Sequence, residues 1–148
     1  MRNDRIKKNG GDPLAAALRF LSRRAHTGSE LTEKLRKRGF GAEETEAVVA
    51  RLLECRYIDD EAYARRYCRL WRERRSRLRI QCEIRKRGVE EDIIAAALAE
   101  EYPPEREVLN CRRALAEKEG PAAEKTAASL YRQGYSAGHI RQALNYCG

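Results

Sequence analysis

Basic side chains are concentrated in one stretch of this chain. Residues 72–87 contain eight lysines and arginines but only two glutamates. Seven of the eight are arginines, whose planar guanidinium group can donate two parallel hydrogen bonds to a phosphate or a carboxylate. These residues predict the binding of a polyanion, such as nucleic acid or an acidic protein surface. The alternative is a helical face that is charged only because solvent covers it.

A shorter basic cluster occurs earlier in the chain, at the same distance from a glycine. Residues 36–38 directly precede Gly39, as residues 85–87 directly precede Gly88. Because the cluster recurs at one position of a repeated pattern, we favour a binding surface over a solvated face. The predicted contact residues are Arg36, Lys37, Arg38, Arg72, Arg74, Arg75, Arg77, Arg79, Arg85, Lys86 and Arg87.

Residues that could catalyse a reaction are not grouped in the sequence. His26 and His139 have no acidic or cysteine partner at the spacing of a catalytic triad or a metal site, and no glycine-rich phosphate loop occurs. The acidic residues 59–61 could bind a divalent cation, but acidic side chains at a helix start are more often caps. We therefore expect no enzyme activity, no catalytic residue, no metal and no cofactor.

The cysteines are odd in number and widely spaced, which does not fit a disulfide framework or a metal site. Several lie among apolar residues of helical patterns. We expect reduced thiols that are mostly buried. They are Cys55, Cys68, Cys82, Cys111 and Cys147.

A segment around Gly39 recurs around Gly88 and again around Gly134, at intervals of 49 and 46 residues. An apolar residue lies four positions before each glycine, and an apolar or aromatic residue follows it directly. A period of this length with helical spacing is typical of a tandem helical array. We therefore predict an all-α fold, built as a tandem array of three three-helix repeats with about nine short helices, elongated and curved.

Breaks in the pattern give the expected domains. We predict a flexible basic tail over residues 1–11, repeat 1 over 12–57, repeat 2 over 58–102 and repeat 3 over 103–148. Each glycine should end a helix, because it adopts the left-handed conformation that follows the last turn. The helices are expected from residue 13, then over 29–38, 42–55, 62–74, 78–87, 92–101, a segment containing 108–115, 122–133 and 136–146.

Three aromatic residues, Tyr63, Tyr67 and Trp71, lie at helical spacing beside the basic stretch. Aromatic side chains next to arginines could stack on bases of single-stranded nucleic acid. At this spacing, however, we interpret them as core residues that pack between repeats.

The overall charge agrees with a polyanionic partner but does not identify one. The formal net charge is +8 and 36% of the residues are charged. No apolar stretch has the length of a membrane span, and no apolar signal-peptide core begins the chain. We expect a monomer in the cytoplasm with no membrane association.

Residues 57–67 (Tyr-Ile-Asp-Asp-Glu-Ala-Tyr-Ala-Arg-Arg-Tyr) are similar to the central signature of the bacterial RecX regulatory proteins. Residues 29–40 resemble the signature of that family's first unit, and residues 84–89 resemble its counterpart in the second. The resemblance covers about residues 14–100. One difference is visible, because 75–77 read Arg-Ser-Arg where family members often have a glycine. The two helices that meet there could therefore be partly continuous.

The resemblance implies a regulator of the RecA recombinase that binds the RecA filament on single-stranded DNA. Such regulators impede filament extension and so suppress ATP hydrolysis, strand exchange and repressor cleavage, which modulates recombination and the SOS response. No catalytic residues are implied. Binding to nucleic acid without RecA is expected to be weak.

Two other functions fit the composition. The first alternative is a stand-alone nucleic-acid-binding helical module, which would bind DNA without RecA and lose affinity steeply as salt rises. The second is an adaptor for another acidic protein, which would have no affinity for DNA.

Overall fold

The computed structural model describes residues 11–147, which form nine α-helices and no strand. The predicted all-α fold is therefore confirmed for this part of the chain. The tail predicted for residues 1–11 lies outside the described residues except for Gly11.

The helices begin and end within about three residues of the predicted positions. They are α2 (Pro13–Arg23), α3 (Gly28–Lys37), α4 (Ala42–Glu54), α5 (Asp60–Trp71), α6 (Arg77–Lys86), α7 (Glu91–Glu101), α8 (Pro104–Leu115), α9 (Gly120–Arg132) and α10 (Ala137–Cys147).

Side chains and glycines determine where these helices start and stop. Thr27 accepts a hydrogen bond from the Glu30 N–H (3.1 Å), and Glu30 accepts one from the Thr27 N–H (3.2 Å), which completes a capping box at the start of α3. Helices α3, α6 and α9 are followed by Gly39, Gly88 and Gly134, with φ angles of 95°, 80° and 98°. The prediction that these glycines end helices is confirmed.

The helices group into two compact units. The N-terminal unit contains the residues up to Tyr63 together with Lys86–Glu90, and the C-terminal unit contains Ala64–Arg85 together with the residues from Glu91 onward. The boundaries that the sequence suggests for three repeats are not tested by this grouping and stay a prediction. Repeats 1, 2 and 3 are used below as names for residues 12–57, 58–102 and 103–148.

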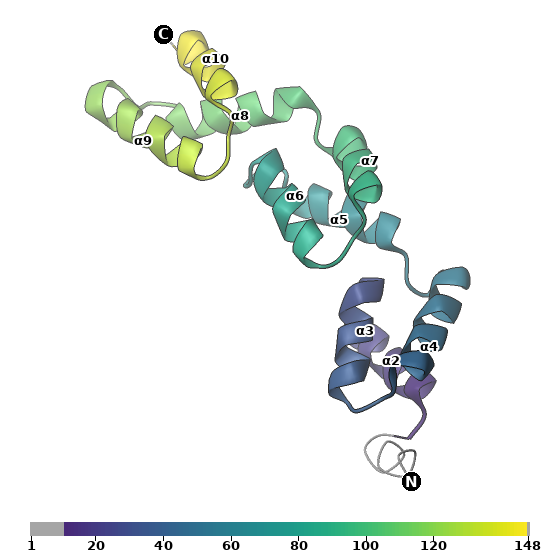
Figure 1. Ribbon diagram of the computed structural model, residues 1–148. Helices are drawn as coiled ribbons and strands as arrows, with labels where there is room; N and C mark the ends of the chain where they lie inside the picture. Colours follow the sequence, from purple (N-terminus) through teal and green to yellow (C-terminus); the bar gives the residue numbers. More distant parts are fainter. Residues whose placement is uncertain (1–10, 148) are drawn as a thin grey trace. The chain divides into compact units, whose positions relative to one another are not determined.

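In the N-terminal unit, helices α2, α3 and α4 pack on one another (Figure 1). Their buried face is made mostly of leucine, alanine and valine at helical spacing, so the amphipathic pattern of each helix explains the packing. The buried core residues are Ala16, Ala17, Leu31, Leu35, Phe40, Val49, Leu52 and Ile58.

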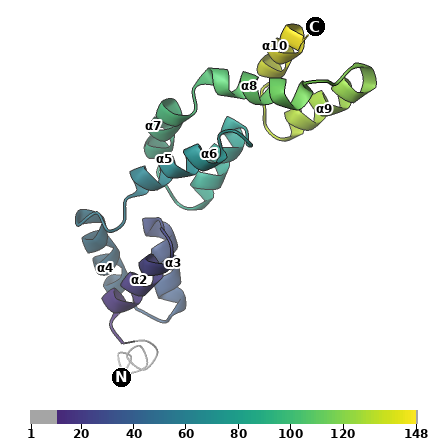
Figure 2. The ribbon, with the colours of Figure 1, turned by 180° about the vertical axis from the view of Figure 1, so that it is seen from behind.

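In the C-terminal unit, α8 contacts both α9 and α10, which also contact each other (Figure 2). The buried residues of this group are Val108, Cys111, Leu115, Leu130, Tyr135, Ile140 and Ala143.

A polar side chain, Asn110, joins these helices to repeat 2. Buried Asn110 of α8 donates from Nδ2 to the Arg72 carbonyl (2.8 Å), the Tyr135 hydroxyl (3.1 Å) and the Tyr102 hydroxyl (3.3 Å).

Consecutive repeats are connected through a hydroxyl group. The Thr27 hydroxyl donates to the Arg87 carbonyl (2.6 Å), within the N-terminal unit. The Ser76 hydroxyl donates to the Gln133 carbonyl (2.8 Å), within the C-terminal unit. Each donor lies twelve residues before the glycine of its own repeat, and each acceptor directly precedes the glycine of the next repeat. The two connections are therefore equivalent.

A carboxylate completes each connection. Asp60 accepts a hydrogen bond from the Gly28 N–H (3.0 Å), and Glu107 accepts one from the Arg77 N–H (2.9 Å). Both N–H groups belong to the first residue of a helix, where no intrahelical acceptor is available. An acid from the first helix of one repeat thus caps the second helix of the repeat before it. Burial raises the pKa of Asp60.

The boundary between the first two helices of repeat 2 is clear in the structure. α5 ends at Trp71 and α6 begins at Arg77, so the helices are separate, as predicted, and not partly continuous. Ser76 accepts a hydrogen bond from the Arg79 N–H (3.1 Å), which makes it the cap of α6 and explains why no glycine is needed there. The buried residues of α5 are Ala64 and Cys68, so the core face of α5 is not the aromatic face that the sequence suggests.

The aromatic residues predicted for the core, Tyr63, Tyr67 and Trp71, are only half-buried. The cysteine prediction holds for two of the four cysteines whose burial is described. Cys68 and Cys111 are buried, and burial raises the pKa of each thiol to about 11. Cys82 of α6 is half-buried, and Cys55, which follows the last residue of α4, is exposed.

Candidate polyanion-binding surface

Four of the predicted contact residues form no salt bridge, cation–π contact or side-chain hydrogen bond with any residue between 11 and 147. They are Arg36, Arg74, Arg77 and Lys86, and all four are exposed. Arg36 and Lys86 belong to the N-terminal unit, and Arg74 and Arg77 belong to the C-terminal unit. Because no carboxylate of the described chain neutralises them, these side chains are the best placed for an external anion.

Arg75 is held inside the C-terminal unit. Its guanidinium carbon lies 3.5 Å from the centre of the Trp71 ring, which is a cation–π contact. The same group pairs with Glu83 and donates to the Tyr67 hydroxyl (3.1 Å), and Tyr67 in turn donates to Glu83. Arg75 is therefore a structural residue that links α5 to α6, and it is a poor candidate for binding a partner.

Glu83 also binds Arg79, whose Nε lies 3.1 Å from the second carboxylate oxygen. Arg79 is exposed, so this pair is open to solvent. Exposed pairs contribute on the order of 0–1 kcal/mol, and an external phosphate could compete for Arg79 more easily than for Arg75.

Arg72 and Arg85 each have a carboxylate partner on or beside α7. Arg72 lies 3.2 Å from a carboxylate oxygen of Glu101, which also pairs with Arg69. Arg85 pairs with both oxygens of Glu91, and this guanidinium lowers the pKa of Glu91. The two arginines are already neutralised locally, which the sequence alone did not reveal.

The remaining predicted residues are also engaged. Lys37 pairs with Glu33 (3.2 Å) one helical turn away, and Arg38 lies 4.9 Å from the centre of the Phe20 ring. Arg87 is half-buried and hydrogen-bonds to Tyr63. In repeat 1, Arg36 therefore stands out as the basic residue of the cluster that has no such contact.

Two residues that the sequence analysis passed over belong to the same position of the repeat. Tyr131 and Arg132 precede Gly134 by three and two residues, as Arg36 and Lys37 precede Gly39. Both are exposed, and Arg132 forms no salt bridge among the described residues. The alignment of the three glycines was the signal that could have identified them.

His26 is a buried titratable group close to Arg24 and Lys34. Its Nδ1 lies 2.9 Å from the Arg24 carbonyl, which can only accept, so Nδ1 carries the proton. Nε2 then accepts from the Lys34 ammonium (2.9 Å). Burial lowers the pKa of His26, and nearby Arg24 and Lys34 lower it further. The neutral imidazole is thus the form that the fold holds.

A pH dependence of stability follows. Because the pKa of His26 is lower in the folded state than in the unfolded chain, the unfolded chain binds more protons as the pH falls below about 6.5. The free energy of unfolding should therefore decrease more between pH 7 and pH 5 in the wild type than in His26→Gln. Urea unfolding at pH 7, 6 and 5 measures this difference, and parallel pH profiles for the two proteins would contradict it.

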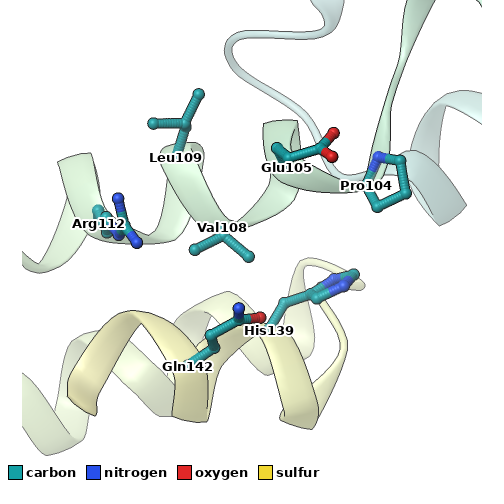
Figure 3. Close-up of a pocket in the computed structure, with 7 residues that line it drawn as sticks. All are labelled: Pro104, Glu105, Val108, Leu109, Arg112, His139 and Gln142. Carbon is teal, nitrogen blue, oxygen red and sulfur yellow. The ribbon is translucent and has the colours of Figure 1, made fainter. Parts of the chain in front are cut away.

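A groove of about 370 Å³ lies between α8 and α10 (Figure 3). Val108 lies between the two helices, while Arg112, His139 and Gln142 face the groove from both sides. His139 Nδ1 lies 2.5 Å from Glu107 Oε2, so the ring also supports the buried carboxylate that caps α6. The other lining residues are Pro104, Glu105 and Leu109.

Residues 11–147 contain no group of three or more histidine, cysteine, aspartate or glutamate side chains that could hold a metal ion. Within the same residues, no helix combines the length and the apolar character needed to cross a bilayer.

Two family models match the chain. Residues 14–52 match the model described as RecX, first three-helix domain, and residues 59–98 match RecX, second three-helix domain. Together the matches cover more than half of the chain, and they coincide with helices α2–α4 and α5–α7.

Curated relatives and solved structures agree with these matches. "Regulatory protein RecX" of Caldanaerobacter subterraneus subsp. tengcongensis is 36% identical, over 87% of this chain and 67% of the relative. The protein of the same name from Trichlorobacter lovleyi is 34% identical, over 88% of this chain and 92% of the relative. The crystal structure of RecX from Lactobacillus salivarius has a TM-score of 0.79 at 22% identity and covers 98% of this chain and 97% of that one. This structural likeness concerns the fold alone.

Proposed function

The chain belongs to the RecX family of regulatory proteins, and we propose that it regulates the RecA recombinase by binding the RecA filament on single-stranded DNA. Binding impedes extension of the filament and thereby lowers ATP hydrolysis, strand exchange and repressor cleavage. The protein then acts in the cytoplasm as a modulator of recombination and the SOS response. The observation that carries this proposal is the match to both three-helix domains in the order expected for the family.

The charge distribution supports the same proposal. A RecA filament on DNA offers phosphates and acidic protein groups, and the net charge of +8 favours approach to such a partner. Four basic side chains can bind the filament without first breaking a salt bridge to a carboxylate of this chain. They are Arg36, Arg74, Arg77 and Lys86. We propose these four as the main contacts and the paired arginines as weaker ones.

The experiment that tests the function is a titration of this protein into RecA on single-stranded DNA while ATP hydrolysis is measured. We expect the rate to fall at well below one protein per RecA, because one bound regulator blocks extension by many RecA subunits. A rate that changes only when the DNA is saturated would instead favour the stand-alone nucleic-acid-binding module. The high net charge keeps that module as the second candidate.

A matched pair of variants tests the contact residues in the same assay. The first changes the four unpaired residues to glutamine (Arg36, Arg74, Arg77 and Lys86). The second changes four basic residues that have partners to glutamine (Lys37, Arg72, Arg79 and Arg85). Because each lost phosphate contact reduces affinity, half-inhibition by the first variant should require about tenfold more protein or more. Half-inhibition by the second variant should require several-fold less protein than half-inhibition by the first. Equal effects with unchanged helicity would contradict the assignment.

A further inference from the structure

Tyr131 is, with Tyr57, one of the two strongly exposed tyrosines among the residues whose burial is described. Its side chain is 65% exposed on α9, whereas Tyr102 and Tyr135 are buried. Those two hydroxyls are hydrogen-bonded, to the Arg75 carbonyl and to Asn110. Tyr131 makes no hydrogen bond and no ring contact with the residues between 11 and 147. Its ring is therefore not needed to hold the described chain together.

The position of Tyr131 in the repeat is a basic position elsewhere. Three residues before the capping glycine, repeats 1 and 2 have Arg36 and Arg85. The next position is basic in all three repeats, and in repeat 3 it is Arg132. Repeat 3 thus keeps one cation at the end of its second helix and exchanges the other for an aromatic ring.

The residues around Tyr131 leave its ring accessible. Helical side chains lean toward the N-terminus of their helix, and the turn over which this ring leans contains Ala127 and Ala128. After Arg132 the helix ends, and Gly134 presents no side chain. The ring therefore rests on small side chains and keeps its outer face open.

We infer that Tyr131 and Arg132 form a stacking site for single-stranded DNA. The tyrosine ring takes the face of one unstacked base, and the arginine takes a neighbouring phosphate. An aromatic side chain beside a cation is the combination that single-strand-binding surfaces use, because every base offers a π face. In a duplex these faces are covered by the neighbouring bases. The inference rests on the proposed function for the identity of the strand.

Two oligonucleotides of equal charge test the site in the absence of RecA. One is fluorescein-labelled (dT)30, and the other has the same phosphates with abasic sugars. We expect Tyr131→Ala to weaken binding to (dT)30 at least about fivefold, the lower end of the range for loss of one stacked base. Its affinity for the abasic strand should be unchanged. Arg132→Gln should weaken binding to both strands by the same factor, because it removes a phosphate contact.

Two control variants make the result specific. Tyr131→Phe keeps the ring and should bind (dT)30 like the wild type. Tyr57→Ala removes a tyrosine that is equally exposed, at 67%, but lies outside the repeated position, and it should have no effect. Circular dichroism establishes that each variant is folded.

The outcomes separate this inference from the proposed function. Equal affinity of Tyr131→Ala and wild type for (dT)30 would overturn the stacking site, even where inhibition of RecA is intact. The same holds if the wild type does not distinguish (dT)30 from the abasic strand. Weaker inhibition of RecA by Tyr131→Ala, with unchanged DNA binding, would assign the ring to a RecA contact and would also overturn the inference.

Discussion

Gly88→Ala should destabilise the protein by about 3 kcal/mol or more. The φ angle at Gly88 is 80°, and a residue with a Cβ loses roughly 1–2 kcal/mol in this conformation. In addition, the new methyl group would overlap the Cβ and Oγ atoms of Ser29. Relief of this overlap moves the start of α3 and breaks the bond from Thr27 to the Arg87 carbonyl, which contributes about 1 kcal/mol. Urea unfolding followed by circular dichroism measures the loss.

Two further variants divide this effect into its causes. Ser29→Gly removes the overlapping atoms, so the double variant should be more stable than the sum of the two single changes predicts. Gly138→Ala is the matched control, because no atom lies within 4 Å of its added methyl group and alanine favours the helix. A Gly88→Ala protein within 1 kcal/mol of wild type would show that the turn adapts easily, contrary to the expectation.

Asn110→Asp should cost about 3 kcal/mol or more at neutral pH. The side chain is 5% exposed and its Nδ2 faces three oxygen acceptors. The Tyr135 hydroxyl can turn to donate, but the Tyr102 hydroxyl already donates to the Arg75 carbonyl and the Arg72 carbonyl has no proton to donate. An aspartate would therefore place a buried negative charge against a carbonyl oxygen, with a large desolvation cost.

The penalty should depend on pH with a definite sign. Burial raises the pKa of the introduced carboxyl in the folded state above its value of about 3.9 in the unfolded chain. Below the unfolded value both states are protonated, and the neutral acid can donate to the Arg72 carbonyl. The difference from wild type should therefore be smallest near pH 4 and grow toward pH 7. Asn110→Leu is the control, because it removes the same donor without a titrating group, and its penalty should not vary with pH.

Most of the helix arrangement could be predicted from local signals in the sequence. Gly39, Gly88 and Gly134 required a left-handed residue after a helix, and all three have positive φ. Thr27 and Glu30 have the sequence spacing of a capping box, and they form one at the start of α3. These signals act over three or four residues, so their physics is contained in a short window of sequence.

The state of the basic residues could not be predicted in the same way. Arg72 pairs with Glu101 across 29 residues, and Arg75 stacks on Trp71 while it pairs with Glu83. Such partners depend on which helix faces meet, and a count of charges treats every arginine alike. The same limit explains the error on α5, where small Ala64 and Cys68 occupy the core while the larger Tyr63, Tyr67 and Trp71 are only half-buried. Helices that approach closely need small residues at their contact. A ranking of residues by hydrophobicity alone does not identify these small residues as the buried ones.

The equivalent connections between repeats have a consequence for how such a chain can grow in evolution. Repeat 2 carries both complementary halves of the connection. Its acceptors, the Arg87 carbonyl and the Asp60 carboxylate, bind hydrogen-bond donors of the preceding repeat. Its donors, the Ser76 hydroxyl and the Arg77 N–H, bind acceptors of the following repeat. A gene duplication confined to repeat 2 would therefore yield a longer array in which each copy docks on the next through bonds that this chain already makes.

Repeat 3 would not support the same kind of growth. Ala122 lies twelve residues before Gly134, at the position that Thr27 and Ser76 occupy in the other repeats. Its methyl group cannot donate to the carbonyl of an added neighbour. Length variants built from this sequence should therefore multiply the middle repeat and keep repeat 3 as the final module.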